Sequence, residues 1–163
     1  MNDEIKKIMS KKVVTFKKED KVKDIAKTMS KKRISCVVIV KNQKAIGIIT
    51  ERDLISKVLL NNKNMDKMMA VDIMSFPVIT ISEDVGLIAM AQLMRKKLIR
   101  RVVVVKNDKI TGIITITNIL DGMMNKIKHL NWQLVHTEIS LDEYIDSLKK
   151  IQIGSVTKEK KTK

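Results

Sequence analysis

The sequence has few of the residue types that most often identify a function. Aromatic side chains make up only 2% of its 163 residues, so the core must be built from aliphatic side chains and methionine. Cys36 is the single cysteine, which excludes an intrachain disulfide and a CxxC metal site. No segment reaches the ~18 consecutive apolar residues that span a bilayer. The N-terminus also lacks the basic and apolar regions of a signal peptide. We therefore expect a cytoplasmic protein with no membrane partner.

Catalytic and metal-binding patterns are also missing. The sequence contains no Walker phosphate loop, no GxGxxG string and no Ser/His/Asp set. His129 and His136 lie seven residues apart, but no further ligands stand at a spacing that would complete a metal site. We predict no enzyme activity, no metal and no required cofactor.

Positive charge, in contrast, is abundant. The net charge is +15, and 28 of the 33 basic residues are lysine, which leaves 5 arginines. Such a balance favours anionic partners, including phosphorylated ligands and nucleic acid. Lysine also serves well as a solvated surface group, whereas arginine is preferred for specific phosphate or base recognition. We favour the surface interpretation. Nucleic-acid binding is the alternative, although few aromatics are available to stack on single-stranded bases.

The most informative feature is an internal repeat. Residues 8–55 align with residues 73–120 without a gap, and 20 of the 48 pairs are identical. The densest match joins residues 37–50 to residues 102–115. A repeat that occurs twice predicts two similar halves that bury their apolar faces against each other.

Each copy has the pattern of a β-α-β-β-α unit, which predicts an α/β (α+β) fold. Continuous Val/Ile runs predict strands, and apolar residues at i, i+3, i+4 and i+7 predict helices that start near residues 19–20 and 82–84. We place repeat 1 at residues 1–62 and repeat 2 at residues 63–125. A helical extension follows at 126–153, with a capping box at residues 140–143. The basic tail, residues 154–163, is predicted to be disordered.

The end of the second hairpin strand carries the most specific string, Gly-Ile-Ile-Thr-x-x-Asp at residues 47–53. Thr50 can cap the following helix while Asp53 bonds back to it, an arrangement worth about 1 kcal/mol. The same geometry can bind a ligand, because a helix N-terminus attracts anions. Asp53 could then accept ribose hydroxyls, and Thr50 and Arg52 could hold phosphate. The two interpretations are compatible.

The ordered motifs, present twice at constant spacing, resemble a pair of CBS (cystathionine-β-synthase) domains, a Bateman module, over residues 5–124. The resemblance implies a pseudo-two-fold disc. It also implies a regulatory function: binding of an adenosine-containing ligand in the inter-repeat cleft and signalling to a partner protein. Expected ligands are AMP, ADP, ATP, S-adenosylmethionine or a dinucleotide. Family members usually dimerise, so we expect a homodimer through the helices.

The resemblance also assigns ligand-binding residues. Ribose and phosphate go to the Thr-x-x-Asp positions, adenine goes beside the opening strand of the same repeat, and phosphate goes to the residues before the hairpin. The predicted residues are Val13, Val14, Thr15, Thr50, Arg52, Asp53, Val78, Ile79, Thr80, Arg100, Arg101, Thr115 and Asn118. Asn118 replaces Asp53 in the second copy, and the arginine pair replaces Ser35 and Cys36. We therefore expect the two sites to bind unequally.

Overall fold

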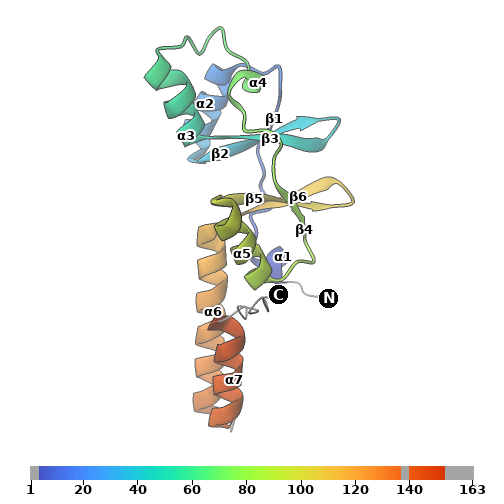
Figure 1. The fold of residues 1–163 in the computed structure, drawn as a ribbon, viewed down its shortest axis with the longest axis vertical. Helices are drawn as coiled ribbons and strands as arrows, with labels where there is room; N and C mark the ends of the chain where they lie inside the picture. The colour runs from blue at the N-terminus through green and yellow to red at the C-terminus, as the bar shows by residue number, and fades with distance from the viewer. Residues whose placement is uncertain (1–3, 137–139, 153–163) are drawn as a thin grey trace, which may run out of the picture.

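Two similar halves are stacked, and a helical hairpin projects from one of them (Figure 1). The structure, a computed structural model, describes residues 4–136 and 140–152. Each half contains a three-stranded sheet in which the first strand is parallel to the second and the second is antiparallel to the third. The strands are β1 (Thr15–Lys17), β2 (Cys36–Lys41) and β3 (Lys44–Thr50), then β4 (Thr80–Ser82), β5 (Arg101–Lys106) and β6 (Lys109–Thr115). The predicted fold class is confirmed.

One amphipathic helix covers each sheet. These are α2 (Val22–Lys32), which buries Val22, Ile25 and Met29, and α5 (Leu87–Lys97). Both begin a few residues later than predicted. The acidic and hydroxyl side chains expected to start the helices instead close turns: Asp20 Oδ2 accepts from the Lys17 N–H at 2.6 Å, and Ser82 Oγ accepts from the Asp84 N–H at 3.3 Å.

The helices that follow the two hairpins differ. In the first half, α3 (Glu51–Asp53) continues as a π-helical segment η1 (Leu54–Val58) and a 3₁₀ turn η2 (Leu59–Asn61). In the second half a single helix, α6 (Ile116–His136), runs for 21 residues, and α7 (Leu141–Gln152) folds back against it. Ser140 Oγ accepts from the Glu143 N–H at 3.2 Å, so the predicted start of α7 is confirmed. The predicted tail, residues 154–163, and the His136 side chain lie outside the described residues.

The opening segment of each repeat crosses to the other half. The short helix α1 (Glu4–Ile8) places Ile5 in the second core, where it is fully buried with Met90 and Ile119. Its counterpart α4 (Ala70–Ile73) places Ile73 in the first core. The two halves are therefore interleaved, and each is completed by chain from the other repeat.

A third apolar cluster joins the two sheets and forms the middle of the predicted disc. Val38 and Val103 are fully buried there, together with Ile113. At the hairpin tips, Lys44 Nζ lies 2.8 Å from Asp108 Oδ2 and links the two halves at the surface. The pseudo-two-fold arrangement predicted from the repeat is confirmed.

Two motif glycines lie closely against methionines of the opposite repeat. A Cβ added at Gly112 would lie 2.6 Å from Met9 Sδ and 3.0 Å from the Ser10 carbonyl oxygen. A Cβ added at Gly47 would lie 2.7 Å from the Sδ of Met74. Strand β3 thus lies directly against residues 73–75, and β6 lies directly against residues 8–10.

Among the described helices, none combines the length and apolarity needed to cross a bilayer.

Candidate functional site

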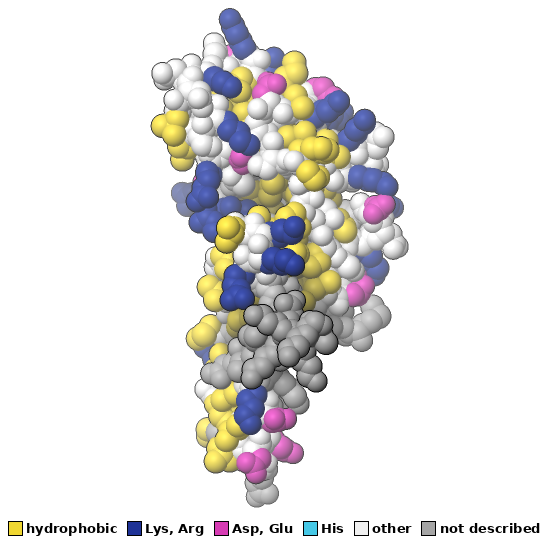
Figure 2. All heavy atoms as spheres, in the orientation of Figure 1, with side chains coloured by type: hydrophobic (Ala, Val, Ile, Leu, Met, Phe, Trp, Pro, Cys, Tyr) yellow, Lys and Arg dark blue, Asp and Glu magenta, His cyan; other side chains and the backbone are white. Residues whose placement is uncertain are grey.

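A cleft of ≈ 230 Å³ opens where the two halves meet. Residues from both repeats line it: the opening segment of repeat 1, the end of α2, the start of β2, the start of β5 and the end of β6. They are Ser10, Lys12, Val13, Val14, Arg33, Ile34, Ser35, Cys36, Val38, Arg101, Ile113 and Thr115. Figure 2 shows basic side chains gathered along the edge at the junction of the halves. The cleft therefore combines an apolar wall with a positive rim.

Arg101 is the most unusual side chain in this cleft. Its Nη2 donates to Ser35 Oγ at 2.6 Å, but its buried Nε finds no acceptor among the described residues. A buried donor without a partner costs about 1–3 kcal/mol, and more when it is charged. Arg101 thus lines the cleft with one guanidinium donor that no described residue satisfies.

Cys36 lies beside this arginine and lines the same cleft. Burial raises the pKa of the Cys36 thiol, and the nearby Arg101 charge only partly opposes that effect. A thiol with a raised pKa stays protonated at neutral pH and is a poor nucleophile. Cys36 therefore acts as a small, neutral part of the wall, as its apolar sequence setting suggests.

At the start of α6, Thr115 and Asn118 form a reciprocal cap. Asn118 Oδ1 accepts from the Thr115 N–H at 2.9 Å and from its Oγ1 at 2.8 Å, while the Asn118 N–H donates to Thr115 Oγ1 at 3.2 Å. Two donors saturate the amide oxygen. The capping interpretation thus holds here, and the Asn118 amide has only its NH₂ group to offer a ligand.

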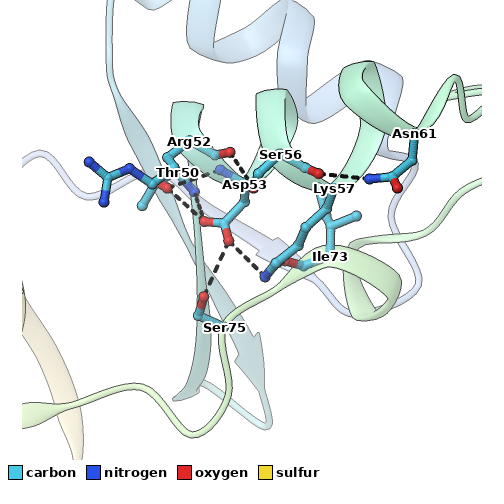
Figure 3. Close-up of polar contacts among 8 residues, drawn as sticks. All are labelled: Thr50, Arg52, Asp53, Ser56, Lys57, Asn61, Ile73 and Ser75. Carbon is cyan, nitrogen blue, oxygen red and sulfur yellow. Dashed lines mark hydrogen bonds and ion pairs between the residues drawn. The ribbon is translucent and has the colours of Figure 1, made fainter.

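Asp53, at the start of α3, is also fully engaged (Figure 3). Its Oδ2 accepts from the Thr50 N–H at 2.9 Å and from Thr50 Oγ1 at 2.6 Å. Its Oδ1 lies 2.7 Å from Lys57 Nζ and 3.3 Å from Ser75 Oγ. The residue is 8% exposed. Arg52 is exposed and points away from this carboxylate, so its predicted role in binding phosphate stays a prediction.

The electrostatics of Asp53 follow from these contacts. Burial on its own would raise the pKa of the Asp53 carboxyl, but the hydrogen bonds from Lys57 and Thr50 outweigh it and leave the pKa below its usual value. Sequence interpretation missed Lys57. The signal was present, because an Asp and a Lys four residues apart lie on one helix face.

Family comparison adds to this geometry. The CBS domain model matches residues 5–60 and 70–125, most of the chain. This chain belongs to the CBS-domain family. An uncharacterised protein of Methanopyrus kandleri is 44% identical over 110 residues, which are 66% of this chain and 56% of that protein. The mitochondrial CBS domain-containing protein CBSX3 of Arabidopsis thaliana is 27% identical over 113 residues, 66% of this chain and 55% of that protein. The chain thus spans little more than half the length of these two relatives.

Solved structures of CBS proteins share the fold. A CBS-domain protein from Burkholderia ambifaria superposes with a TM-score of 0.67 at 26% identity, covering 71% of this chain and 85% of that one. A hexameric CBS-CP12 protein from bloom-forming cyanobacteria has a TM-score of 0.66 at 23% identity and covers 90% of this chain and 95% of that one. CBS pairs are generally regulatory modules rather than catalytic ones.

Within this CBS pair, four of the predicted site residues meet in the cleft: Val13, Val14, Arg101 and Thr115. The sequence grouped Val13 and Val14 with Thr50 and Asp53 of their own repeat, whereas in this cleft they lie with Arg101 and Thr115 of the second repeat. The crossing of the opening segments explains the difference. Ser10, Lys12, Arg33 and Ser35 were not among the predicted site residues, yet they also line the cleft.

The other predicted residues lie elsewhere. Thr15 lies in β1 and lines a separate groove of ≈ 850 Å³ near the hairpin tips, and Thr80 is exposed on β4. Val78 packs between the sheets, and Ile79 packs against the second core. Arg100 is exposed, and its carbonyl oxygen accepts from the Ile116 N–H at 3.1 Å.

Proposed function

We propose that this protein is a regulatory, non-enzymatic CBS pair that binds a phosphorylated adenosine ligand in the cleft between its halves and passes the bound state to a partner protein. The observation that carries the proposal is Arg101, which lines that cleft and whose buried Nε has no acceptor among the described residues. A cytoplasmic location, expected from the sequence, belongs to the same proposal.

The chemistry of the cleft favours phosphate-bearing ligands. Lys12, Arg33 and Arg101 together give it positive charge, and charge-assisted hydrogen bonds from arginine to phosphate are among the stronger polar contacts. AMP, ADP and ATP fit this charge better than S-adenosylmethionine does, because the latter carries a sulfonium cation. Val13, Val14 and Val38 offer an apolar surface for the base.

The volume of the cleft limits how much of the ligand it encloses. At ≈ 230 Å³ it is smaller than the ≈ 300–1,000 Å³ typical of small-molecule sites. It therefore holds part of a nucleotide and leaves the rest at the surface. A ligand held there contacts residues of both repeats, so its binding would shift the population of relative arrangements of the halves, to the extent that it binds one arrangement more tightly.

A ligand panel tests this function. Binding at a free concentration 100-fold above Kd stabilises a protein by about 2.7 kcal/mol. For a chain of this size that raises Tm by about 5–10 °C. We expect such shifts with AMP, ADP or ATP, a smaller shift with S-adenosylmethionine, and calorimetric binding that Arg101→Gln abolishes. Arg95→Gln, at the exposed end of α5, is the matched control. The proposal is refuted if no ligand of the panel shifts Tm.

Nucleic-acid binding is the second candidate, and one observation favours it. The groove near the hairpin tips is lined by Lys17, Lys18, Lys41 and Lys109. If this surface binds RNA or DNA, affinity should fall steeply with salt, as expected when lysines release counterions from phosphates. Fluorescence anisotropy with a labelled oligonucleotide at several salt concentrations measures that slope.

We also propose that the protein forms a homodimer through its exposed helical surfaces. Ile55 and Leu59 in the first half are 51% and 58% exposed, and their repeat counterparts Leu120 and Met124 are 55% and 53% exposed. Apolar surface in such matched stripes is typical of self-association. The similar cyanobacterial CBS-CP12 protein is a hexamer. Light scattering should give a dimer for the natural chain and a monomer for Leu120→Glu.

A further inference from the structure

The positions that should form two equivalent ligand sites carry different residues in the two repeats. An offset of 65 residues relates Asp53 to Asn118 and Lys57 to Gly122. The first repeat thus has a carboxylate with a lysine one turn later. The second has a neutral amide with a glycine one turn later, where no side chain can reach back.

In the first half the lysine lies over the carboxylate (Figure 3). Lys57 Nζ is 2.7 Å from Asp53 Oδ1 and donates to the Ile73 carbonyl oxygen at 2.6 Å, so it bridges η1 and α4. Ser75 Oγ approaches the same carboxylate oxygen at 3.3 Å. The Asp53 side chain is left with 11% of its surface exposed.

These contacts occupy the atoms that a ribose would need. The two carboxylate oxygens of Asp53 receive hydrogen bonds or ion pairs from Thr50, Lys57 and Ser75. A ligand hydroxyl could bond to Oδ1 only by displacing Lys57 or competing with it. If Lys57 were displaced, the nearly buried Asp53 carboxylate would lose its counter-charge, which costs free energy.

In the second half the corresponding space is used differently. A Cβ added at Gly122 would lie 3.1 Å from Ile8 Cγ2, so α6 approaches α1 closely at this position. No ammonium group neutralises the cap at Asn118 from there. The nearby cleft instead contains Arg101, with its unpartnered Nε.

We propose that Lys57 closes the site around Asp53, so that this CBS pair binds one nucleotide per chain, in the Arg101 cleft. The inference rests on the proposed function. It adds the number of nucleotides bound per chain and names Lys57 as the residue that determines that number. The Lys57 ammonium group pairs with the Asp53 carboxylate, to which the hydroxyls of a ribose would otherwise bind.

Calorimetric titration with ATP tests the closure. The natural chain should bind a single ATP per chain, and Lys57→Met, which keeps the apolar stem but removes the ammonium group, should bind two. Lys57→Arg retains the charge and should bind one. Combining Lys57→Met with Arg101→Gln should leave one site, now at Asp53. Circular dichroism melting verifies that each variant is folded.

The outcomes separate the two proposals. Two ATP molecules on the natural chain would overturn the closure and leave the proposed function standing. One ATP on a folded Lys57→Met variant would do the same. No ATP on the natural chain but one on Lys57→Met would support the closure and overturn the assignment to the Arg101 cleft. No binding by any variant would overturn both proposals.

Discussion

Replacing the two motif glycines by alanine tests whether the repeats interlock as described. In Gly47→Ala, the three atoms nearest the new Cβ all belong to the Met74 side chain, at 2.7, 3.2 and 3.3 Å. Methionine has three rotatable bonds and adapts readily. In Gly112→Ala, the new Cβ meets Met9 Sδ at 2.6 Å and Cγ at 2.9 Å, and also the backbone oxygen of Ser10 at 3.0 Å. That oxygen accepts from the Ile113 N–H at 2.9 Å, so it has little freedom to move.

The magnitudes follow from these contacts. Overpacking costs about 1–3 kcal/mol where neighbours cannot relax, while a Gly to Ala change returns about 0.4–1 kcal/mol by restricting the unfolded chain. We therefore expect Gly112→Ala to lower the free energy of unfolding by about 1–2 kcal/mol. Gly47→Ala should stay within about 1 kcal/mol of the natural chain.

Urea unfolding followed by circular dichroism measures both values, and a loss of about 1–2 kcal/mol lowers Tm by about 2–8 °C for a chain of this length. Gly112→Ala made in a Met9→Ala background, compared with Met9→Ala alone, is the control. The sulfur clash is absent there but the backbone contact remains, so the loss caused by Gly112→Ala should be smaller than in the natural chain but not zero. Equal losses for the two single variants, or a larger loss for Gly47→Ala, would refute the reasoning.

Three further predictions concern single residues. Ile5→Ala should destabilise the chain by about 2–5 kcal/mol, because a fully buried side chain leaves a cavity in the second core; hydrogen exchange should show the loss mainly in β5 and α5. Arg52→Ala should change unfolding free energy and ATP affinity little, within about 0.5 kcal/mol, because the side chain is exposed and directed away from Asp53. The lowered pKa of Asp53 means that its carboxylate stabilises the fold above the ordinary pKa of ~3.9. That contribution should be lost as pH falls through the folded pKa, and Asp53→Asn should weaken this acid dependence in melting curves.

The repeat made most of the fold predictable from sequence. Identical residues at constant spacing located both hairpins, and the helical spacing of Val22, Ile25 and Met29 identified the buried face of α2. The capping box at Ser140 located α7, because hydrogen bonding of this kind depends only on nearby residues.

The assembly of the site was less predictable, because it depends on which half each opening segment joins. A short amphipathic segment such as residues 4–9 has the same pattern whichever core receives it. The grouping of Val13 with Thr115 across the repeats therefore carries no local signal. Lys57 is different. Its spacing from Asp53 was readable, but a lysine near an aspartate on a helix is most often a surface pair, and only the burial of Asp53 shows otherwise.

The interleaving of the halves has a consequence for how such a chain can be divided. A fragment that stops after residue 62 keeps α1 but loses the sheet that buries Ile5, and it also lacks Ile73, which completes its own core. Such a fragment could be completed only by the other half of the chain, the two pieces exchanging α1 and α4. The residues between η2 and α4 convert that bimolecular encounter into an intramolecular one, at an effective concentration in the millimolar range for a short flexible linker. Because the copies are joined in one chain, the stability of the fold should not depend on protein concentration. Limited proteolysis within residues 62–69 should make it depend on concentration.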